Sequence, residues 1–314
     1  MADGTPTTPT TPTTSTANLK TGSGTLFTQK QVTDVFNKVA GHSAIAALST
    51  QKPIPFAGSD SYIFTMDGEA AIVGEGSNKP AGAAEFKKTS VKPVKIVYQH
   101  RLTDEFCHLS DEARLPYLQE FQDGFAKKIA RALDIMYFHG LNPATKETSA
   151  AVSGASFATK ITQTKTYDAA NADDNINDAV HDILDKDGSP SGIAMAPKFA
   201  YALGQIKEKT GSKIPLYPEF RGAGNPGSFM GLKSDINNTL AFNDSSIMAI
   251  VGDFAGAMKW GYTKNIWMEQ IEYGDPDGQG DLKRTNEIVL RAEAYVGCGI
   301  IDPDSFVKIV KSSS

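Results

Sequence analysis

Hydrophobic residues recur at intervals of three and four over one long stretch of the chain. Its apolar positions are Leu118, Phe121, Phe125, Ile129, Ala132 and Met136. This spacing places them on one face of a helix. Ser110 offers an N-cap before the stretch, and Gly140 with Pro143 ends it. The pattern predicts a helix over residues 111–139, roughly 40 Å long at 1.5 Å per residue, which is long enough to cross the whole molecule.

The residues before this helix alternate with a period of two instead. Residues 94–102 (VKIVYQHRL) are typical of a strand, and between residues 51 and 93 glycines and prolines separate short alternating runs such as residues 62–66 (YIFTM). This texture predicts a long β-hairpin with too few apolar residues for a core of its own. A two-stranded hairpin is marginal in water. We therefore expect it to lie on another structure, for which a second copy of the chain is one candidate.

The rest of the chain mixes helices and strands. A polar, turn-rich segment over residues 145–168 precedes a helix predicted at 173–186, a strand at 192–196 and a helix that opens at Pro197 and ends at Gly211. Further strands are predicted at 247–252, 260–271, 287–296 and 306–310. This order indicates a mixed α/β unit.

The N-terminal region differs from all of this. Residues 1–16 are mostly Thr and Pro, which favour a disordered or polyproline-like tail. They contain no basic segment followed by an apolar one, so we do not expect a signal peptide. A short amphipathic helix is predicted around residues 32–39, ended by Gly41. No run approaches the roughly 20 apolar residues that cross a bilayer.

Charge and cysteine content narrow the classes of protein. The 314 residues carry 31 Lys and Arg against 36 Asp and Glu, a net charge of −5. Proteins that hold nucleic acid by counterion release normally have a basic excess, so this class is disfavoured. Cys107 and Cys298 cannot form a disulfide framework or a four-thiolate zinc site. We expect folding in a reducing compartment.

Three candidate sites for chemistry are weak. Gly222-x-Gly224-x-x-Gly227 matches the dinucleotide fingerprint, but no buried strand precedes it and Pro226 interrupts the turn, so a plain loop is favoured. Residues 275–280 begin like a calcium-binding loop, but position 12 is Asn286 rather than a glutamate, which favours a solvated hairpin loop.

The third candidate is the neighbouring pair of Cys107 and His108. On an extended segment these side chains would point to opposite faces, so a thiolate–imidazole pair is disfavoured. The sequence contains no metal-binding spacing of its histidines, no nucleophile elbow and no phosphate-binding loop. We therefore predict no catalytic, cofactor-binding or metal-binding residues, and no enzyme.

Several short motifs follow one another in a fixed order. They are residues 71–76 (AIVGEG), 86–89 (FKKT), 92–95 (KPVK), 102–106 (LTDEF), 132–136 (ALDIM), 138–140 (FHG), 195–197 (MAP), 229–231 (FMG), 251–254 (VGDF), 291–295 (RAEAY) and 302–306 (DPDSF). On these motifs the chain resembles the major capsid proteins of tailed bacteriophages, the Hong Kong 97-like family, over about residues 51–310.

The resemblance implies an α+β fold of the Hong Kong 97-like type. A peripheral domain would combine a long spine helix with a long-stranded sheet, beside an axial mixed α/β domain, an extended β-hairpin loop and an N-terminal arm. The implied segments are a disordered Thr/Pro tail (1–18), the N-terminal arm (19–51), the extended loop (52–93), the peripheral domain (94–166, with its spine helix at 111–139), the axial domain (167–266) and a return to the peripheral domain (267–310).

The resemblance also implies a function and partners. The chain would be a structural protein that self-assembles as pentamers and hexamers into the icosahedral shell around the double-stranded DNA genome of a tailed bacteriophage. Its partners would be copies of itself, a portal, a scaffold, possibly decoration proteins, and packaged DNA bound without sequence specificity; no membrane is implied. It would belong to the virion and assemble in the cytoplasm of the bacterial host.

Two alternatives belong to other classes. An encapsulin-like nanocompartment shell of the same fold would enclose protein cargo instead of a genome. A nucleotide-binding α/β enzyme would use the loop around Gly222. The contents of purified shells separate the first alternative from a virus capsid, and thermal stabilisation by nicotinamide nucleotides without large assemblies would favour the second.

Overall fold

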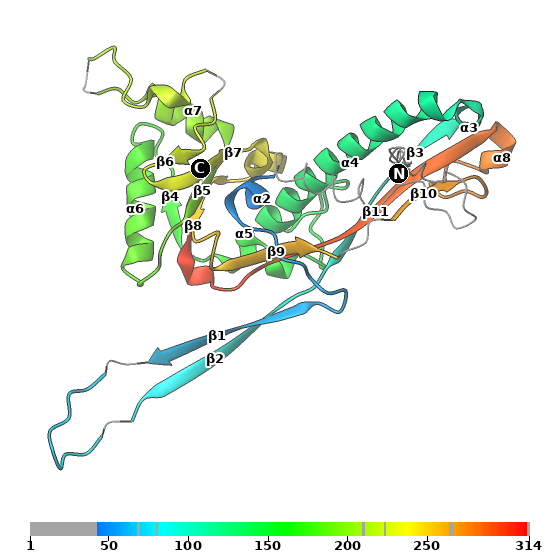
Figure 1. Cartoon of the computed structure of the whole chain (residues 1–314). Coiled ribbons are helices and arrows are strands. Elements are labelled where there is room, and N and C mark those ends of the chain that lie inside the picture. Colours follow the sequence, from blue (N-terminus) through cyan, green and yellow to red (C-terminus); the bar gives the residue numbers. More distant parts are fainter. Residues whose placement is uncertain are drawn as a thin grey trace, which may run out of the picture.

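The computed structural model describes residues 43–67, 70–79, 81–208, 211–222, 224–263 and 267–312 (Figure 1). The tail predicted at 1–18 and the helix predicted around residues 32–39 lie outside the described residues. In the described part, a two-stranded hairpin projects from a body that contains two larger sheets and one long helix (Figure 1). The predicted combination of helices with separate sheets is confirmed.

The hairpin predicted between residues 51 and 93 is present. Its strands are β1 (Ser59–Asp67) and β2 (Ala83–Val91), which pair antiparallel from Ser59 with Val91 to Asp67 with Ala83. Figure 1 shows the two strands extending away from the rest of the chain, with the loop that joins them at the far end. Only the base of the hairpin, near Val91, meets the body.

The four-stranded sheet is organised by its longest strand, β11 (Glu287–Ile300). β3 (Val94–Thr103) pairs with the first ten residues of β11, from Glu287 to Val296. On its other edge β11 pairs with β10 (Trp267–Ile271) and then with β9 (Met258–Tyr262). The single strand predicted at 260–271 is therefore wrong: two strands contact successive parts of β11, which also runs four residues beyond its predicted end.

The predicted long helix is α4 (Asp111–His139), and it lies along the four-stranded sheet (Figure 1). The Ser110 hydroxyl accepts a hydrogen bond from the backbone N–H of Ala113 at 3.3 Å, which caps the helix. Gly140 ends it with a left-handed φ of 73°. All six positions of the predicted apolar stripe are buried. α4 is therefore a strut about 43 Å long.

The second sheet has six strands in the order β4-β12-β8-β5-β7-β6. Their bounds are Thr164–Thr166 (β4), Phe306–Val310 (β12), Ile247–Gly252 (β8), Gly192–Met195 (β5), Leu232–Ile236 (β7) and Ser228–Phe229 (β6). The strand predicted at 306–310 is confirmed as β12, which pairs with β8 and β4 in this sheet. The last strand of the chain therefore completes the sheet that β8 and β5 form.

Two helices cover one face of this sheet. α6 (Ala172–Leu184) agrees with its prediction, whereas α7 (Pro197–Gln205) ends before Ile206 rather than at Gly211. The reason is an alternative pairing: the N–H of Leu216 donates to the Ile206 carbonyl at 2.9 Å, which pulls residue 206 into an extended conformation. The remaining short helices are α2 (Ala44–Leu48), α3 (Glu105–His108), α5 (Phe157–Lys160) and α8 (Leu282–Thr285), with 3-10 turns at η1 (Ser153–Ala155), η2 (Pro218–Phe220), η3 (Asn238–Asp244) and η4 (Pro303–Ser305).

The core consists of two apolar clusters on opposite faces of the six-stranded sheet. On one face, Val307 and Ile309 of β12 pack with α6 and α7. On the other face, Phe306 of the same strand packs with Phe157 of α5 and with the interior between α4 and the four-stranded sheet. Alternate residues of one strand thus join both clusters, and the body is one continuous structure from which only the hairpin projects.

Candidate assembly surface

The hairpin carries an exposed aromatic face. Tyr62 and Phe64 lie two residues apart on β1 and therefore point to the same side, where Phe86 of β2 stands opposite Phe64. The Phe86 ring lies 5.4 Å from the Tyr62 ring and 6.0 Å from the Phe64 ring, centroid to centroid. All three side chains are more than half exposed. A contiguous aromatic face without a covering partner is typical of a binding surface.

Charged side chains flank this aromatic face. Lys88 Nζ lies 2.8 Å from the Asp60 carboxylate on the same side of the hairpin. On the opposite side, Lys87 forms an ion pair with Glu85 at 3.3 Å. Such exposed ion pairs add little stability. The two sides of the hairpin therefore differ: one carries the three aromatic rings, and the other carries the ion pair of Lys87 and Glu85.

The base of the hairpin is seated on glycines of the four-stranded sheet. A Cβ atom at Gly261 of β9 would collide with the carbonyl oxygen of Lys52, and one at Gly299 of β11 would lie 2.5 Å from Val91 Cγ2. At Gly297 the nearest atom would be Ile54 Cδ1 at 3.1 Å. The two chain segments that enter and leave the hairpin therefore approach the sheet more closely than any side chain would permit.

Specific bonds fix this base. The N–H groups of Lys52 and Ile54 donate to the Trp260 and Tyr262 carbonyls of β9 at 2.9 and 3.3 Å. Lys259 Nζ lies 2.6 Å from Ser59 Oγ at the start of β1. The hairpin is thus attached firmly at one end, while its aromatic face lies beyond the attachment.

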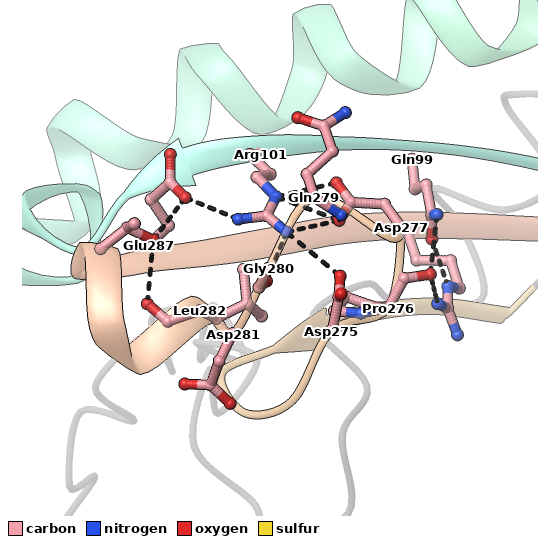
Figure 2. Close-up of polar contacts among 12 residues, drawn as sticks. Gln99, Arg101, Asp275, Pro276, Asp277, Gln279, Gly280, Asp281, Leu282 and Glu287 are labelled. Atoms are coloured by element: carbon pink, nitrogen blue, oxygen red, sulfur yellow. Dashed lines mark hydrogen bonds and ion pairs between the residues drawn. The ribbon is translucent and has the colours of Figure 1, made fainter.

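The opposite end of the same sheet holds a polar cluster around Arg101 of β3 (Figure 2). The guanidinium binds both carboxylate oxygens of Asp277 and lies 2.8 Å from Glu287 and 3.4 Å from Asp275. It also donates to the Gly280 carbonyl at 2.7 Å. Its planar array of donors suits this bidentate arrangement. Arg101 therefore holds the loop between β10 and β11 against β3.

A second arginine extends the cluster. Arg291 of β11 donates to the Gln99 side-chain oxygen at 2.8 Å, and both Gln99 and Arg291 donate to the Pro276 carbonyl (Figure 2). The hydrogen bond from Arg101 lowers the pKa of the Asp277 carboxyl to about 2. The predicted hairpin loop joins the antiparallel strands β10 and β11, and most of its residues are exposed as expected. Its contacts with Arg101, which were not predicted, hold it against β3.

The short motif that resembled a calcium loop lies in this cluster. Asp275 and Asp277 direct their carboxylates to Arg101 (Figure 2). Since a guanidinium occupies the position where a cation would be bound, the geometry is that of an ion-pair network. Among the described residues, no group of three or more His, Cys, Asp and Glu side chains could hold a metal ion.

A buried carboxylate joins three segments at the centre of the molecule. Asp134 of α4 is fully buried and accepts four hydrogen bonds: from Ser43 Oγ at 2.6 Å, from the N–H groups of Ala44 and Ile45 at 2.9 and 3.3 Å, and from Thr239 Oγ1 at 2.9 Å. Burial raises the pKa of Asp134 to about 6, against the lowering effect of these bonds. The carboxylate fixes the N-terminus of α2, where the described chain begins, to the long helix.

The loop that matches the dinucleotide fingerprint has a different setting. Gly222 and Gly227, with φ of 85° and 71°, lie between η2 and β6. The fingerprint requires a strand before the glycines and a helix after them, and the structure has a 3-10 turn and a short strand instead. The loop interpretation is therefore confirmed for these residues.

The prediction for Cys107 and His108 rested on a wrong local structure. Both residues lie in α3 rather than on an extended segment, because Cys107 N–H donates to the Asp104 carbonyl and closes a helical turn. The Cys107 sulfur accepts a hydrogen bond from Gln270 Nε2 at 3.0 Å. Burial raises the pKa of the Cys107 thiol, which disfavours the reactive thiolate.

The sequence alone did not predict which residues come together in the aromatic face or around Asp134. The alternation around Tyr62 and Phe64 was visible, but its pairing with Phe86 required the register of the hairpin. The signal for Asp134 was a single acid inside the apolar run of residues 132–136. No helix of the described chain is long and apolar enough to cross a bilayer.

The described chain thus combines a projecting hairpin, a long helix on a long-stranded sheet and a second, six-stranded sheet. The sequence model of the Phage capsid family matches residues 23–311. The chain belongs to this family. No curated protein matches the chain.

Solved structures agree. A chain of Mycobacterium phage Ogopogo superimposes with a TM-score of 0.73 at 29% sequence identity, over 86% of this chain and 92% of that one. A chain of Gordonia phage Cozz gives a TM-score of 0.72 at 23% identity over 87% of both chains. The capsid of the native GTA particle gives 0.61 at 16% identity over 88% and 91%. The fold is thus Hong Kong 97-like.

Together these findings identify a major capsid protein, a structural component of the virion that forms an icosahedral shell from many copies. The features that bear on this function are surfaces rather than a catalytic cleft. The exposed aromatic face of the hairpin is the most prominent of them.

Proposed function

We propose that the shell closes because the aromatic face of the β1–β2 hairpin is buried on a neighbouring copy of the chain. The observation that carries this proposal is the exposure of Tyr62, Phe64 and Phe86 on a hairpin that, within the described residues, projects away from the body beyond its base (Figure 1). A two-stranded hairpin of this length is not stable alone in water. A neighbour that covers the aromatic face supplies the missing burial.

The energies are consistent with assembly. Complete burial of one such aromatic side chain contributes about 1.5–3 kcal/mol. One hairpin therefore provides a modest attraction, and the same contact repeated around pentamers and hexamers makes closure favourable without any strong single interface. The firm attachment at Gly261, Gly297 and Gly299 directs the hairpin, so that the contact also carries geometric information.

The shell encloses the double-stranded DNA genome of a tailed phage, on this proposal. The net charge of −5 supports a container, since a strongly basic wall would hold the packed DNA. A portal, a scaffold and possibly decoration proteins complete the assembly, which takes place in the cytoplasm of the bacterial host. The subunit performs no catalysis and requires no cofactor.

We further assign the segments of the subunit to positions in the shell. The four-stranded sheet with α4 forms the peripheral domain, and the six-stranded sheet with α6 and α7 forms the axial domain around the symmetry axes of pentamers and hexamers. We assign residues 306–310 to the axial domain as well, and their pairing within the six-stranded sheet supports this assignment. We assign residues 19–51 to the N-terminal arm, and the bond from Ser43 to Asp134 fixes its described part to α4.

Expression of the full chain, with a scaffold supplied where one is required, tests this function. Negative-stain electron microscopy is expected to show closed shells, tubes or rings of subunits. Nucleic acid inside shells isolated from infected cells supports a genome container, whereas a uniform protein cargo would identify a nanocompartment instead. A monodisperse monomer under all conditions would contradict the proposal.

A further inference from the structure

A polar cavity lies on the body, away from the hairpin. It has a volume of about 320 Å³ and lies where the C-terminal end of α4, the loop after η3 and strand β12 meet. Its polar lining residues are His139, Asn243, Ser245, Ser246 and Lys308. Among the described residues no carboxylate lines it, although Asp244 lies in the same loop. The cavity therefore combines the cation of Lys308 with the hydroxyl and amide donors of Ser245, Ser246 and Asn243, while His139 Nε2 already bonds the Thr239 carbonyl at 2.7 Å.

Lys308 is the unusual member of this lining. It lies in the middle of β12, between two paired strands, and only 8% of its surface is exposed. Within the described residues, Lys308 Nζ donates one hydrogen bond, to the Ala158 carbonyl at 2.7 Å. An ammonium group has three donors. Two of them remain for whatever occupies the cavity.

A nearby anion would stabilise the buried ammonium group of Lys308. A buried charge is costly unless it is paired, and burial accordingly lowers the pKa of Lys308. A second cation is close by, since Lys311 Nζ donates to the Ser245 carbonyl at 3.2 Å in the loop that borders the cavity. The hydroxyl groups of Ser245 and Ser246 and the amide of Asn243 are further donors suited to an anion with several oxygens.

We propose that this cavity binds a phosphate group, with Lys308 as its principal partner. Free phosphate and the phosphate of packaged DNA share this chemistry and are its two sources. The site is independent of the proposed role of the hairpin, because none of its lining residues belongs to the hairpin.

Thermal unfolding of the full-length chain, followed by circular dichroism at pH 7, tests the proposal. The chain is heated in about 10 mM phosphate and, as the reference, in sodium chloride of equal ionic strength. This phosphate concentration is about ten times the Kd of a site with millimolar affinity. The unfolding midpoint of the natural chain is expected to rise by about 3 °C. Lys308→Met, which keeps the apolar stem and removes the charge, is expected to abolish this rise.

Two further variants make the result specific. Lys127→Met removes an exposed positive charge on α4 and is expected to keep the full response to phosphate. Ser246→Phe fills the cavity without altering Lys308, and decides the question if Lys308→Met fails to fold: it is expected to lose the response.

A short DNA duplex in place of phosphate separates the two sources. If the duplex raises the unfolding midpoint of the natural chain but not that of Lys308→Met, the DNA backbone is the ligand. If only phosphate raises the midpoint, the ligand is the free anion. Equal responses of the natural chain, Lys308→Met and Ser246→Phe, or no response of the natural chain to either probe, would overturn the proposal.

Discussion

Phe64 and Phe86 face each other across the β1–β2 hairpin with ring centroids 6.0 Å apart, and 58% and 65% of their surfaces are exposed. Their mutual contact covers only part of each ring. The hairpin itself projects away from the body of the chain (Figure 1). On the proposed function, the exposed surface of this pair serves contact between copies.

Phe86→Ser is expected to leave the unfolding midpoint of the isolated chain within about 1 °C of its original value, because the ring is already exposed. Shells are expected to fail or to dissociate at lower denaturant concentration, since each copy loses about 1.5–3 kcal/mol of burial. Lys87→Ser, on the opposite side of the same strand, is the matched control and should retain shells. Shells of Phe86→Ser as stable as those of the natural chain would exclude the aromatic face as a contact.

Gly261→Ala tests the attachment of the hairpin. The new methyl group would collide with the carbonyl oxygen of Lys52, so the segment that hydrogen-bonds to β9 must move. We expect a loss of about 2 kcal/mol in the free energy of unfolding, measured by urea titration. Gly124→Ala on α4 meets no atom within 4 Å and is expected to be neutral or to stabilise the helix by about 0.5–1 kcal/mol. Equal effects of the two substitutions would show that the close approach at Gly261 is unimportant.

The ion pair of Arg101 and Asp277 predicts a dependence of stability on acid. The folded-state pKa of Asp277 is lowered from 3.8 to about 2. The stabilisation is therefore complete above about pH 4 and is lost as the pH falls toward 2. The unfolding midpoint of the natural chain, measured from pH 5 to pH 2.5, is expected to fall more steeply than that of Asp277→Asn.

Asp281→Asn is the control for this series. The Asp281 carboxylate accepts a hydrogen bond from the Lys283 N–H at the start of α8 and lies outside the set of groups that bind Arg101 among the described residues. Its midpoint is expected to follow the natural chain through the acid range. Parallel curves for the natural chain and Asp277→Asn would contradict the assignment of this acid-sensitive stability to the Arg101 cluster.

Asp134 predicts the opposite slope. Its folded-state pKa is raised from 3.8 to about 6. Between these values the folded chain binds more protons than the unfolded chain, so this residue makes the free energy of unfolding fall as the pH rises from about 4 to about 6. Asp134→Asn cannot titrate and is expected to lack this contribution in urea titrations at a series of pH values. An identical pH profile of the two chains would show that Asp134 does not titrate in this range.

Asp134→Ala separates the hydrogen bonds from the charge. It leaves the Ser43 hydroxyl and the N–H groups of Ala44 and Ile45 buried without this acceptor, whereas the Thr239 hydroxyl keeps Asn237 Oδ1 at 3.0 Å. A loss of about 3 kcal/mol or more in the free energy of unfolding is expected. Unchanged stability would show that the four bonds are not coupled to folding.

Local patterns were sufficient for the regular part of the fold. The apolar stripe, the cap at Ser110 and the terminating Gly140 together define α4, because each acts within one or two helical turns. The two-stranded hairpin followed from glycine and proline punctuation around alternating runs. The strand predicted at 247–252 is confirmed as β8, and all six of its residues are buried. A short apolar run was a sufficient local signal for it.

Features that depend on distant partners could not be predicted. α7 ends early because Leu216 pairs with Ile206, and β12 joins the six-stranded sheet through partners such as β8, over fifty residues earlier. The binding of Asp134 to residues ninety and more positions away, and the seating of the hairpin on Gly261, require the folded chain. The glycines of β9 and β11 carry no local signal of what approaches them.

Replacement of residues 62–88 by a two-residue Asn-Gly turn, which joins the paired residues Ser61 and Thr89, tests the central claim most directly. The hairpin meets its own body only at its base, so the shortened chain is expected to keep its circular dichroism spectrum and an unfolding midpoint within about 2 °C of the original. Electron microscopy should then show folded subunits and no closed shells. Closed shells like those of the full chain, or unfolding of the whole shortened chain, would contradict the conclusion that this hairpin binds neighbouring copies.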